Sequence, residues 1–261
     1  MQRVFLILVL LAGTAGVFAQ DTTKTKKQER RQRINNLIVR EEEEGVIVYK
    51  KQFVGGAKLT NDGYGGFLEW GRAKSIKTSI LYQFEILEQK SPKEVKIVNQ
   101  LFPVSSFVYG KENFLYPVKL GVQKQKLLGN KSNKNGVSIT GNYGGGLLLG
   151  ILRPYYVQLQ DGSYIKYDSD SASKSTFINN PDSIIGGPTF SKGWSEITVT
   201  PGIYVKTSLR FDYGIYNELV SALEIGLSAE YYTKNIPIMA LSEQKKFFLQ
   251  AYVAILFGKR K

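Results

Sequence analysis

The sequence predicts an all-β fold: an eight-stranded antiparallel up-and-down transmembrane β-barrel with a short charged N-terminal tail or helix. Three observations predict it. Segments of ten or more residues alternate between apolar and polar side chains with a period of two, the pattern of a strand with two different faces. The connections between these segments alternate between short and long. The chain is rich in aromatic residues, with 16 Tyr and 14 Phe, and many stand near the segment ends, as at the two interfaces of a bilayer.

The segment 247–257 shows the alternation most clearly. One set of alternate positions is entirely apolar and has an aromatic residue at each end: Phe247, Leu249, Ala251, Val253, Ile255 and Phe257. Because roughly 9–11 tilted residues suffice for a strand to cross a bilayer, this segment is long enough to span one. An unpaired strand edge in hydrocarbon costs several kcal/mol for each exposed backbone group, so the strands are expected to close into a barrel.

Eight segments have strand-like patterns: 45–60, 63–73, 76–88, 113–127, 136–160, 196–211, 218–233 and 245–258. The seventh illustrates the two faces. Its Leu223, Ile225 and Leu227 are expected to face lipid, whereas Glu224 and Glu230 point inward. The third, fourth and sixth segments repeat this arrangement.

The lengths of the connections test the barrel independently. Outer-membrane barrels have short periplasmic turns and longer outer loops. With the first strand starting on the periplasmic side, the second, fourth and sixth connections should be short, and they are: 74–75, 128–135 and 212–217. The outer connections include 89–112 and 161–195, and only the one around Asn61 and Asp62 is tight.

The domain organisation follows from the remaining segments. Arg3, the apolar run 4–11 and small residues up to Ala19 have the layout of a secretory signal peptide, residues 1–19. Residues 20–44 form a charged periplasmic segment that ends in four consecutive Glu. The barrel occupies 45–258, and 259–261 form a basic C-terminal tail.

Charged residues on the inward faces predict a network in the lumen. They are Glu69, Glu85, Lys119, Lys206, Arg210, Glu224 and Glu230. An eight-stranded barrel is just wide enough for side chains to fill it, and an isolated ion there is strongly disfavoured. The charges are therefore expected to pair and to plug the barrel. A narrow polar conduit is the alternative.

A second group of charges should lie at the periplasmic rim. This basic collar comprises Arg72, Lys74, Lys77, Lys124, Lys126, Lys131, Lys134, Lys259, Arg260 and Lys261. The formal net charge of the chain is +13. We expect the collar to contact inner-leaflet lipid phosphates or an acidic periplasmic protein partner. Its alternative role is to set orientation and solubility.

Several kinds of chemistry are missing from the sequence. There is no His and no Cys, so the His-dependent catalysis of barrel lipases and proteases, His/Cys zinc sites and disulfides are excluded. Asp168 and Asp170 lack the Gly and the distal Glu of a calcium loop. The glycines 144–146 are not followed by the Lys-Ser/Thr of a phosphate loop, and a bend in a strand covered by a neighbouring ring is expected instead. No enzyme activity, cofactor or nucleic-acid partner is predicted.

Over about 45–258, the signal peptide, alternation, loop lengths and aromatic last strand make the chain resemble the small outer-membrane β-barrel proteins of Gram-negative envelopes. The resemblance implies the fold and the cell outer membrane as location, and it carries over no site residues. Three functions stay open. The first is a non-enzymatic structural or interaction role, as a monomeric barrel or as a subunit of an envelope assembly or secretion complex. The second is a narrow channel or transporter for small or apolar solutes. The third is a secreted soluble β-barrel or sandwich binder.

Overall fold

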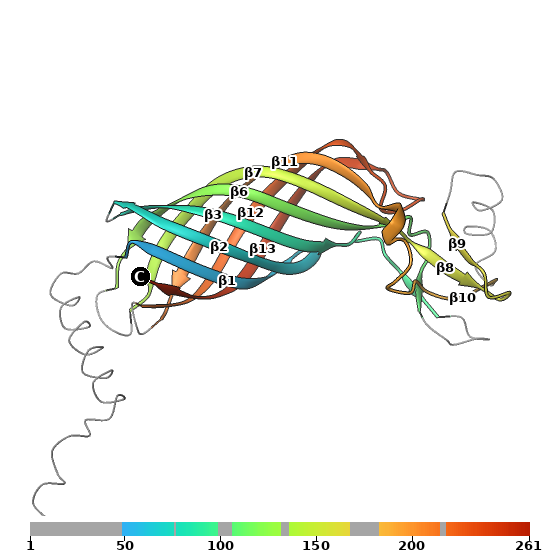
Figure 1. Cartoon of the computed structure of the whole chain (residues 1–261), viewed down its shortest axis with the longest axis horizontal. Coiled ribbons are helices and arrows are strands. Elements are labelled where there is room, and N and C mark those ends of the chain that lie inside the picture. The colour runs from blue at the N-terminus through green and yellow to red at the C-terminus, as the bar shows by residue number, and fades with distance from the viewer. Residues whose placement is uncertain (1–48, 76, 99–105, 132–135, 168–182, 215–217) are drawn as a thin grey trace, which may run out of the picture. The chain divides into compact units, whose positions relative to one another are not determined.

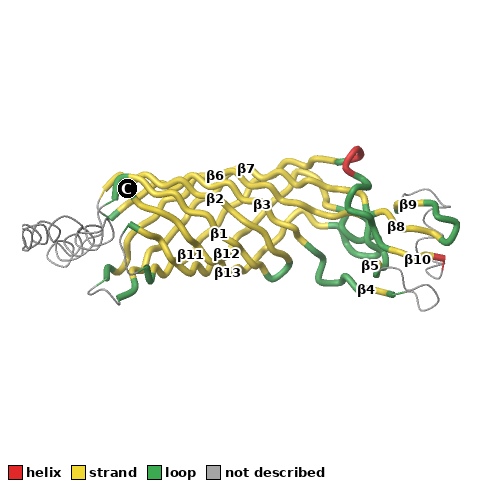
Figure 2. Tube along the Cα trace, turned by 60° about the horizontal axis from the view of Figure 1, so that its bottom comes forward, coloured by secondary structure: helices red, strands yellow, loops and turns green. Residues whose placement is uncertain are grey.

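The computed structural model describes residues 49–75, 77–98, 106–131, 136–167, 183–214 and 218–261, and all structural statements concern these residues. Eight long strands form one closed sheet: β1 (Lys51–Thr60), β2 (Gly63–Ser75), β3 (Thr78–Gln89), β6 (Asn113–Gly129), β7 (Ser138–Pro154), β11 (Thr198–Asp212), β12 (Leu219–Ile236) and β13 (Lys245–Arg260). Each strand pairs antiparallel with the next one along the chain, and β1 pairs with β13 to close the ring (Figures 1 and 2). The predicted eight-stranded up-and-down barrel is confirmed.

The barrel is apolar outside and polar inside. On β13, the apolar side chains that the alternation assigns to lipid expose 43–62% of their surface: Phe247, Leu249, Val253, Ile255 and Phe257. The intervening Gln250 and Tyr252 are almost fully buried in the lumen. A soluble sandwich would bury the first set and expose the second. The hypothesis of a secreted soluble binder is therefore wrong.

The two ends of the barrel differ in the length of their connections. At the end that holds the start of β1 and the C-terminus, residues 76–77, 130–137 and 213–218 join the strands. At the opposite end, the connections 90–112 and 155–197 are long and only 61–62 is tight. The predicted alternation is confirmed. We call the first end the inner end and the second the outer end, following the rule for outer-membrane barrels.

The fifth predicted strand, 136–160, is too long. β7 ends at Pro154, because proline has no N–H to donate to a ladder. After Tyr155, residues Tyr156–Leu159 form β8, which belongs to a separate sheet with β9 (Tyr164–Lys166) and β10 (Ile184–Gly186).

The connections at the outer end carry further structure. β4 (Lys96–Ile97) pairs with β5 (Phe107–Val108), and a 3-10 helix, η2, spans Trp194–Glu196. Figure 1 shows β8, β9 and β10 beyond the outer end. We call β4, β5, β8, β9, β10 and η2 together the outer cap.

Glycines in the wall make room for lumen rings. A Cβ on Gly121 of β6 would lie 2.2 Å from the hydroxyl of Tyr204, which is buried in the lumen. Gly144–Gly146 are part of the continuous strand β7, and Gly146 is the partner of both Gly121 and Tyr204. No phosphate loop exists there.

Some predictions fall outside the described residues. These are the signal peptide 1–19, the charged segment 20–44, the start of the first predicted strand and the Asp168–Asp170 pair. No helix in the described ranges is long and apolar enough to cross a membrane.

Candidate functional site

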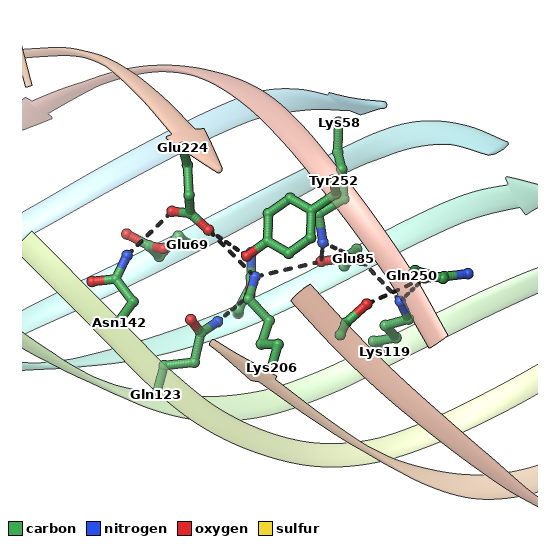
Figure 3. Close-up of polar contacts among 12 residues, drawn as sticks. Lys58, Glu69, Glu85, Lys119, Gln123, Asn142, Lys206, Glu224, Gln250 and Tyr252 are labelled. Carbon is green, nitrogen blue, oxygen red and sulfur yellow. Dashed lines mark hydrogen bonds and ion pairs between the residues drawn. The ribbon is translucent and has the colours of Figure 1, made fainter. Parts of the chain in front are cut away.

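Among the described residues, the lumen of the barrel gathers eight buried charged side chains, six of which are labelled in Figure 3. Seven are those predicted from the inward faces of the strands: Glu69, Glu85, Lys119, Lys206, Arg210, Glu224 and Glu230. The eighth, Lys58 on β1, was missed, although it alternates with the outward Ala57 and Leu59. The eight comprise four carboxylates and four cations, so their formal charges sum to zero.

The inner group of the network is centred on Arg210 of β11. Its Nη1 and Nη2 donate to the two carboxylate oxygens of Glu69 on β2, at 2.9 and 2.7 Å. Its Nε donates to Oε2 of Glu224 on β12 at 2.8 Å. Asn142 and Tyr252 also donate to Glu224, at 3.2 and 2.8 Å. One guanidinium therefore bridges two carboxylates, and amide and hydroxyl donors add hydrogen bonds to the oxygens of Glu224.

The outer group of the network is centred on Glu85 of β3. Lys58 Nζ donates to both of its oxygens, at 2.8 and 2.7 Å, and Lys119 Nζ approaches one of them at 3.2 Å. Lys119 also pairs with Glu230 at 2.5 Å. Tyr232 donates to the other oxygen of Glu230 at 3.1 Å. Side chains from β1, β3, β6 and β12 thus form one continuous set of ion pairs across the lumen.

Lys206 lies between the two groups. Its Nζ donates to Gln83 at 2.9 Å and lies 3.9 Å from Glu85 and 3.7 Å from Glu224. The ring of Tyr252 separates it from Lys58, whose Nζ is 3.9 Å from the ring centroid. The network is therefore continuous along the lumen, as Figure 3 shows.

Comparisons with known proteins add a fold likeness only. No family model matches the sequence, and no curated protein matches it. Three similar solved structures are the N-terminal β-barrel domain of Pseudomonas aeruginosa OprF, Neisserial surface protein A and the attachment invasion locus protein Ail of Yersinia pestis. Their TM-scores are 0.38, 0.37 and 0.35, with identities of 11%, 11% and 9%. They cover 80%, 82% and 82% of this chain, which spans 98%, 96% and 99% of theirs.

Such low sequence identities and TM-scores carry no argument about function. The kind of barrel is therefore assigned from the architecture of this chain. A closed ring of eight antiparallel strands exposes apolar side chains and buries a neutral charge network. The chain is an eight-stranded β-barrel of the outer-membrane type. Such a barrel resides in an outer membrane, with its apolar wall against lipid.

The inner mouth of the barrel is closed by a second set of ion pairs. Asp212 of β11 pairs with Arg260 at 2.6 Å and with Lys131 at 3.7 Å. Below the network, a cavity of about 180 Å³ is lined by Tyr49, Gln125 and other polar residues.

The described residues of the predicted basic collar fall into two groups in the structure: some pair with Asp212, and others are exposed at the inner end. Arg260 and Lys131 turn toward Asp212, so they are engaged within the barrel. Lys134 lies outside the described residues. The remaining members are exposed at the inner end: Arg72, Lys74, Lys77, Lys124, Lys126, Lys259 and Lys261. Their contact with lipid or with an acidic protein remains a prediction.

The outer end holds two buried cations that the sequence analysis did not single out. Arg153 lies among aromatic rings, with its guanidinium carbon 4.3 Å from the centroid of Phe114 and 4.9 Å from that of Trp194. Lys111 pairs with Glu94 at 2.7 Å. Burial lowers the pKa of Lys111, and the hydrogen bond to Glu94 opposes this shift. Burial raises the pKa of Tyr155 to about 12.

Among the described residues, no group of three or more Asp and Glu side chains is arranged so that it could hold a metal ion.

Proposed function

We propose that this chain is a non-conducting, non-enzymatic outer-membrane barrel that anchors an interaction surface in the membrane. The observation that carries this proposal is the lumen network. Each of its eight charges has an oppositely charged partner within 4 Å. The role as a monomer or as a subunit of an envelope complex is compatible with this architecture.

The network opposes ion flow for a physical reason. An eight-stranded barrel leaves room for side chains and little else. Lys119 and Glu85 are each about 1% exposed, so they sit in a dry environment. Separating such a pair to let an ion pass would leave uncompensated buried charges, at a cost of about 3–5 kcal/mol for each broken pair.

The outer cap supports an interaction role. Its core is continuous with the top of the barrel: Phe107, Tyr155, Val157 and Ile184 pack in one cluster with Leu115 of β6. The hydroxyl of Tyr155 accepts the backbone N–H of Val108 at 2.8 Å. The described part of the outer cap is thus held on the end of the barrel, and loops carried on a rigid scaffold are common binding surfaces.

The absence of His from the chain supports a non-enzymatic role, since it removes the side chain best suited to proton transfer at neutral pH.

Conductance in planar bilayers tests the proposal. The wild-type barrel is expected to insert without steady currents. A matched variant, K58S/E85S/K119S/E230S, removes the outer group while keeping the net charge, and it should conduct if it folds. Folding of both proteins is checked by heat-modifiable migration on gels. Steady open currents from the wild-type protein would overturn the proposal and favour the channel hypothesis.

A further inference from the structure

A large groove lies on the outside of the barrel wall near its inner end. It crosses β13, β1, β2 and β3 and has a volume of about 1040 Å³. Because it is on the outward face, lipid and not the lumen adjoins it. It shares no member with the lumen charge network.

The floor of the groove is aromatic. Phe53, Trp70, Tyr82 and Phe257 line it and expose 47–61% of their surfaces. The rings of Phe53 and Trp70 are 5.4 Å apart, and Trp70 is the cross-strand partner of Tyr82. The hollow is created by Gly55, which lies between Phe257 and Leu68 in the strand register and has no side chain. An acyl chain fits such a hollow.

The rim of the groove is cationic. Lys51, Arg72, Lys259 and Lys261 line it, and no acidic residue does. Arg72 is the cross-strand partner of Lys51, whose backbone exchanges two hydrogen bonds of 2.8 Å with that of Lys261. None of these four cations forms an ion pair with the described residues, in contrast to Arg260 and Lys131. Their charges are free to meet an external anion.

The cationic rim is confined to one side of the barrel. Across the ring from β1 and β2, the connections next to β7 and β11 expose Val137 and Tyr213, whereas Leu219 of β12 is the cross-strand partner of Lys259 and adjoins the rim. Lys124 and Lys126 are also exposed, on β6, but they lie outside the groove.

We propose that this groove is a binding site for an anionic phospholipid of the inner leaflet. The lipid phosphate binds Arg72, Lys51 and Lys259, and an acyl chain packs over Gly55 between Phe53 and Phe257. An aromatic floor below a cationic rim matches the order of headgroup and acyl chain at a membrane interface. The occupant is a lipid because the floor belongs to the membrane-facing wall. This site does not depend on whether the lumen conducts.

Trp70 supplies a direct reporter. The chain has two Trp, and Trp194 lies at the outer end, so W194F leaves a single Trp in the groove. The protein is reconstituted into phosphatidylcholine vesicles containing phosphatidylglycerol, with brominated acyl chains on one lipid or the other. Brominated phosphatidylglycerol is expected to quench Trp70 with a relative binding constant at least about fivefold that of brominated phosphatidylcholine, from about 1 kcal/mol for each cation near the phosphate.

Two variants locate the preference. R72Q/K259Q should reduce it to less than twofold, whereas the matched control K124Q/K126Q removes the same charge outside the groove and should retain it. Gly55→Leu keeps every charge but fills the hollow, and it should also reduce the preference; a Cβ there is 3.3 Å from the flexible end of Leu68. Heat-modifiable migration confirms that each variant is folded.

Three results would overturn the inference. Equal quenching by the two brominated lipids means that there is no anionic site. Equal loss in K124Q/K126Q and R72Q/K259Q means a diffuse surface charge. A preference that appears only after Glu41–Glu44 are replaced by Gln means that the chain's own acidic segment occupies the rim. None of these results bears on the conductance experiment, so the two proposals fail separately.

Discussion

Arg210 and Glu69 join opposite walls of the barrel. They lie on β11 and β2, which are four strands apart in either direction around the eight-stranded ring. Two parallel hydrogen bonds of 2.9 and 2.7 Å connect the guanidinium and the carboxylate across 141 residues of sequence. This bidentate pair therefore connects the two walls across the width of the lumen. Arg210 also donates to Glu224 of β12, so three strands are joined by one guanidinium.

Replacing Arg210 with Met should strongly destabilise the barrel. The substitution leaves Glu69 and Glu224 buried without their guanidinium, which costs about 3–5 kcal/mol of unfolding free energy. Adding E69Q and E224Q should recover much of the loss, because the buried charges are then gone. The measurement is urea unfolding in lipid vesicles followed by Trp fluorescence, with the exposed Lys124→Met as control. A loss below about 1 kcal/mol for R210M would contradict a dry, paired network.

The close approach of the Tyr204 ring to Gly121 predicts that alanine destabilises the barrel at Gly121 much more than at Gly129. G121A places a Cβ 2.2 Å from the Tyr204 hydroxyl and 2.6 Å from the carbonyl oxygen of Gly145, so it should cost about 1–3 kcal/mol. G129A on the same strand meets nothing closer than 3.8 Å, at Ile139, and should be nearly neutral. The same unfolding assay compares them, and equal effects would mean that the ring does not pack on Gly121.

Much of this architecture was predictable from alternation alone, because a period of two fixes which side chains share a face. That rule assigned Glu85 and Glu224 to the lumen. Lys58 escaped notice because Gly55, Gly56 and Ala57 before it blur the contrast between the faces. The rule was misleading at Tyr156–Leu159, where the strand-like pattern continues past Pro154 into a different sheet.

The sequence could not predict which cation pairs with which carboxylate across the lumen. Which cation meets Glu69 depends on the stagger of strands around the ring, and a shift by two residues would offer Ser208 or Asp212 in place of Arg210. The inward turn of Arg260 toward Asp212 had the same cause: its place at the rim was clear, but its partner came from another strand.

Tyr155 predicts a stability loss at high pH. Burial raises its pKa to about 12, above the ordinary value of 10.0, so the fold favours the neutral phenol. Its contribution is fully present below pH 10 and is lost as the pH rises to about 12. Y155F removes the acceptor of the Val108 N–H and should cost about 1 kcal/mol at pH 8.

The wild-type advantage over Y155F should shrink between pH 10 and 12. It can be followed in a W70F background, where Trp194 fluorescence reports on the outer end during unfolding. Tyr213→Phe, on an exposed ring, serves as the control. A wild-type advantage that stayed constant up to pH 12 would show that the phenol is not held in a buried environment.

The orientation of the barrel can be tested by single-cysteine labelling, because the chain has no Cys of its own. Glu243 is exposed in the outer connection between β12 and β13, and Ser75 is exposed at the inner end of β2. With short turns in the periplasm and long loops outside, E243C should react with a membrane-impermeant maleimide on intact cells. S75C should react only after the outer membrane is permeabilised. The reverse pattern would place the outer cap in the periplasm and move the lipid groove to the outer leaflet.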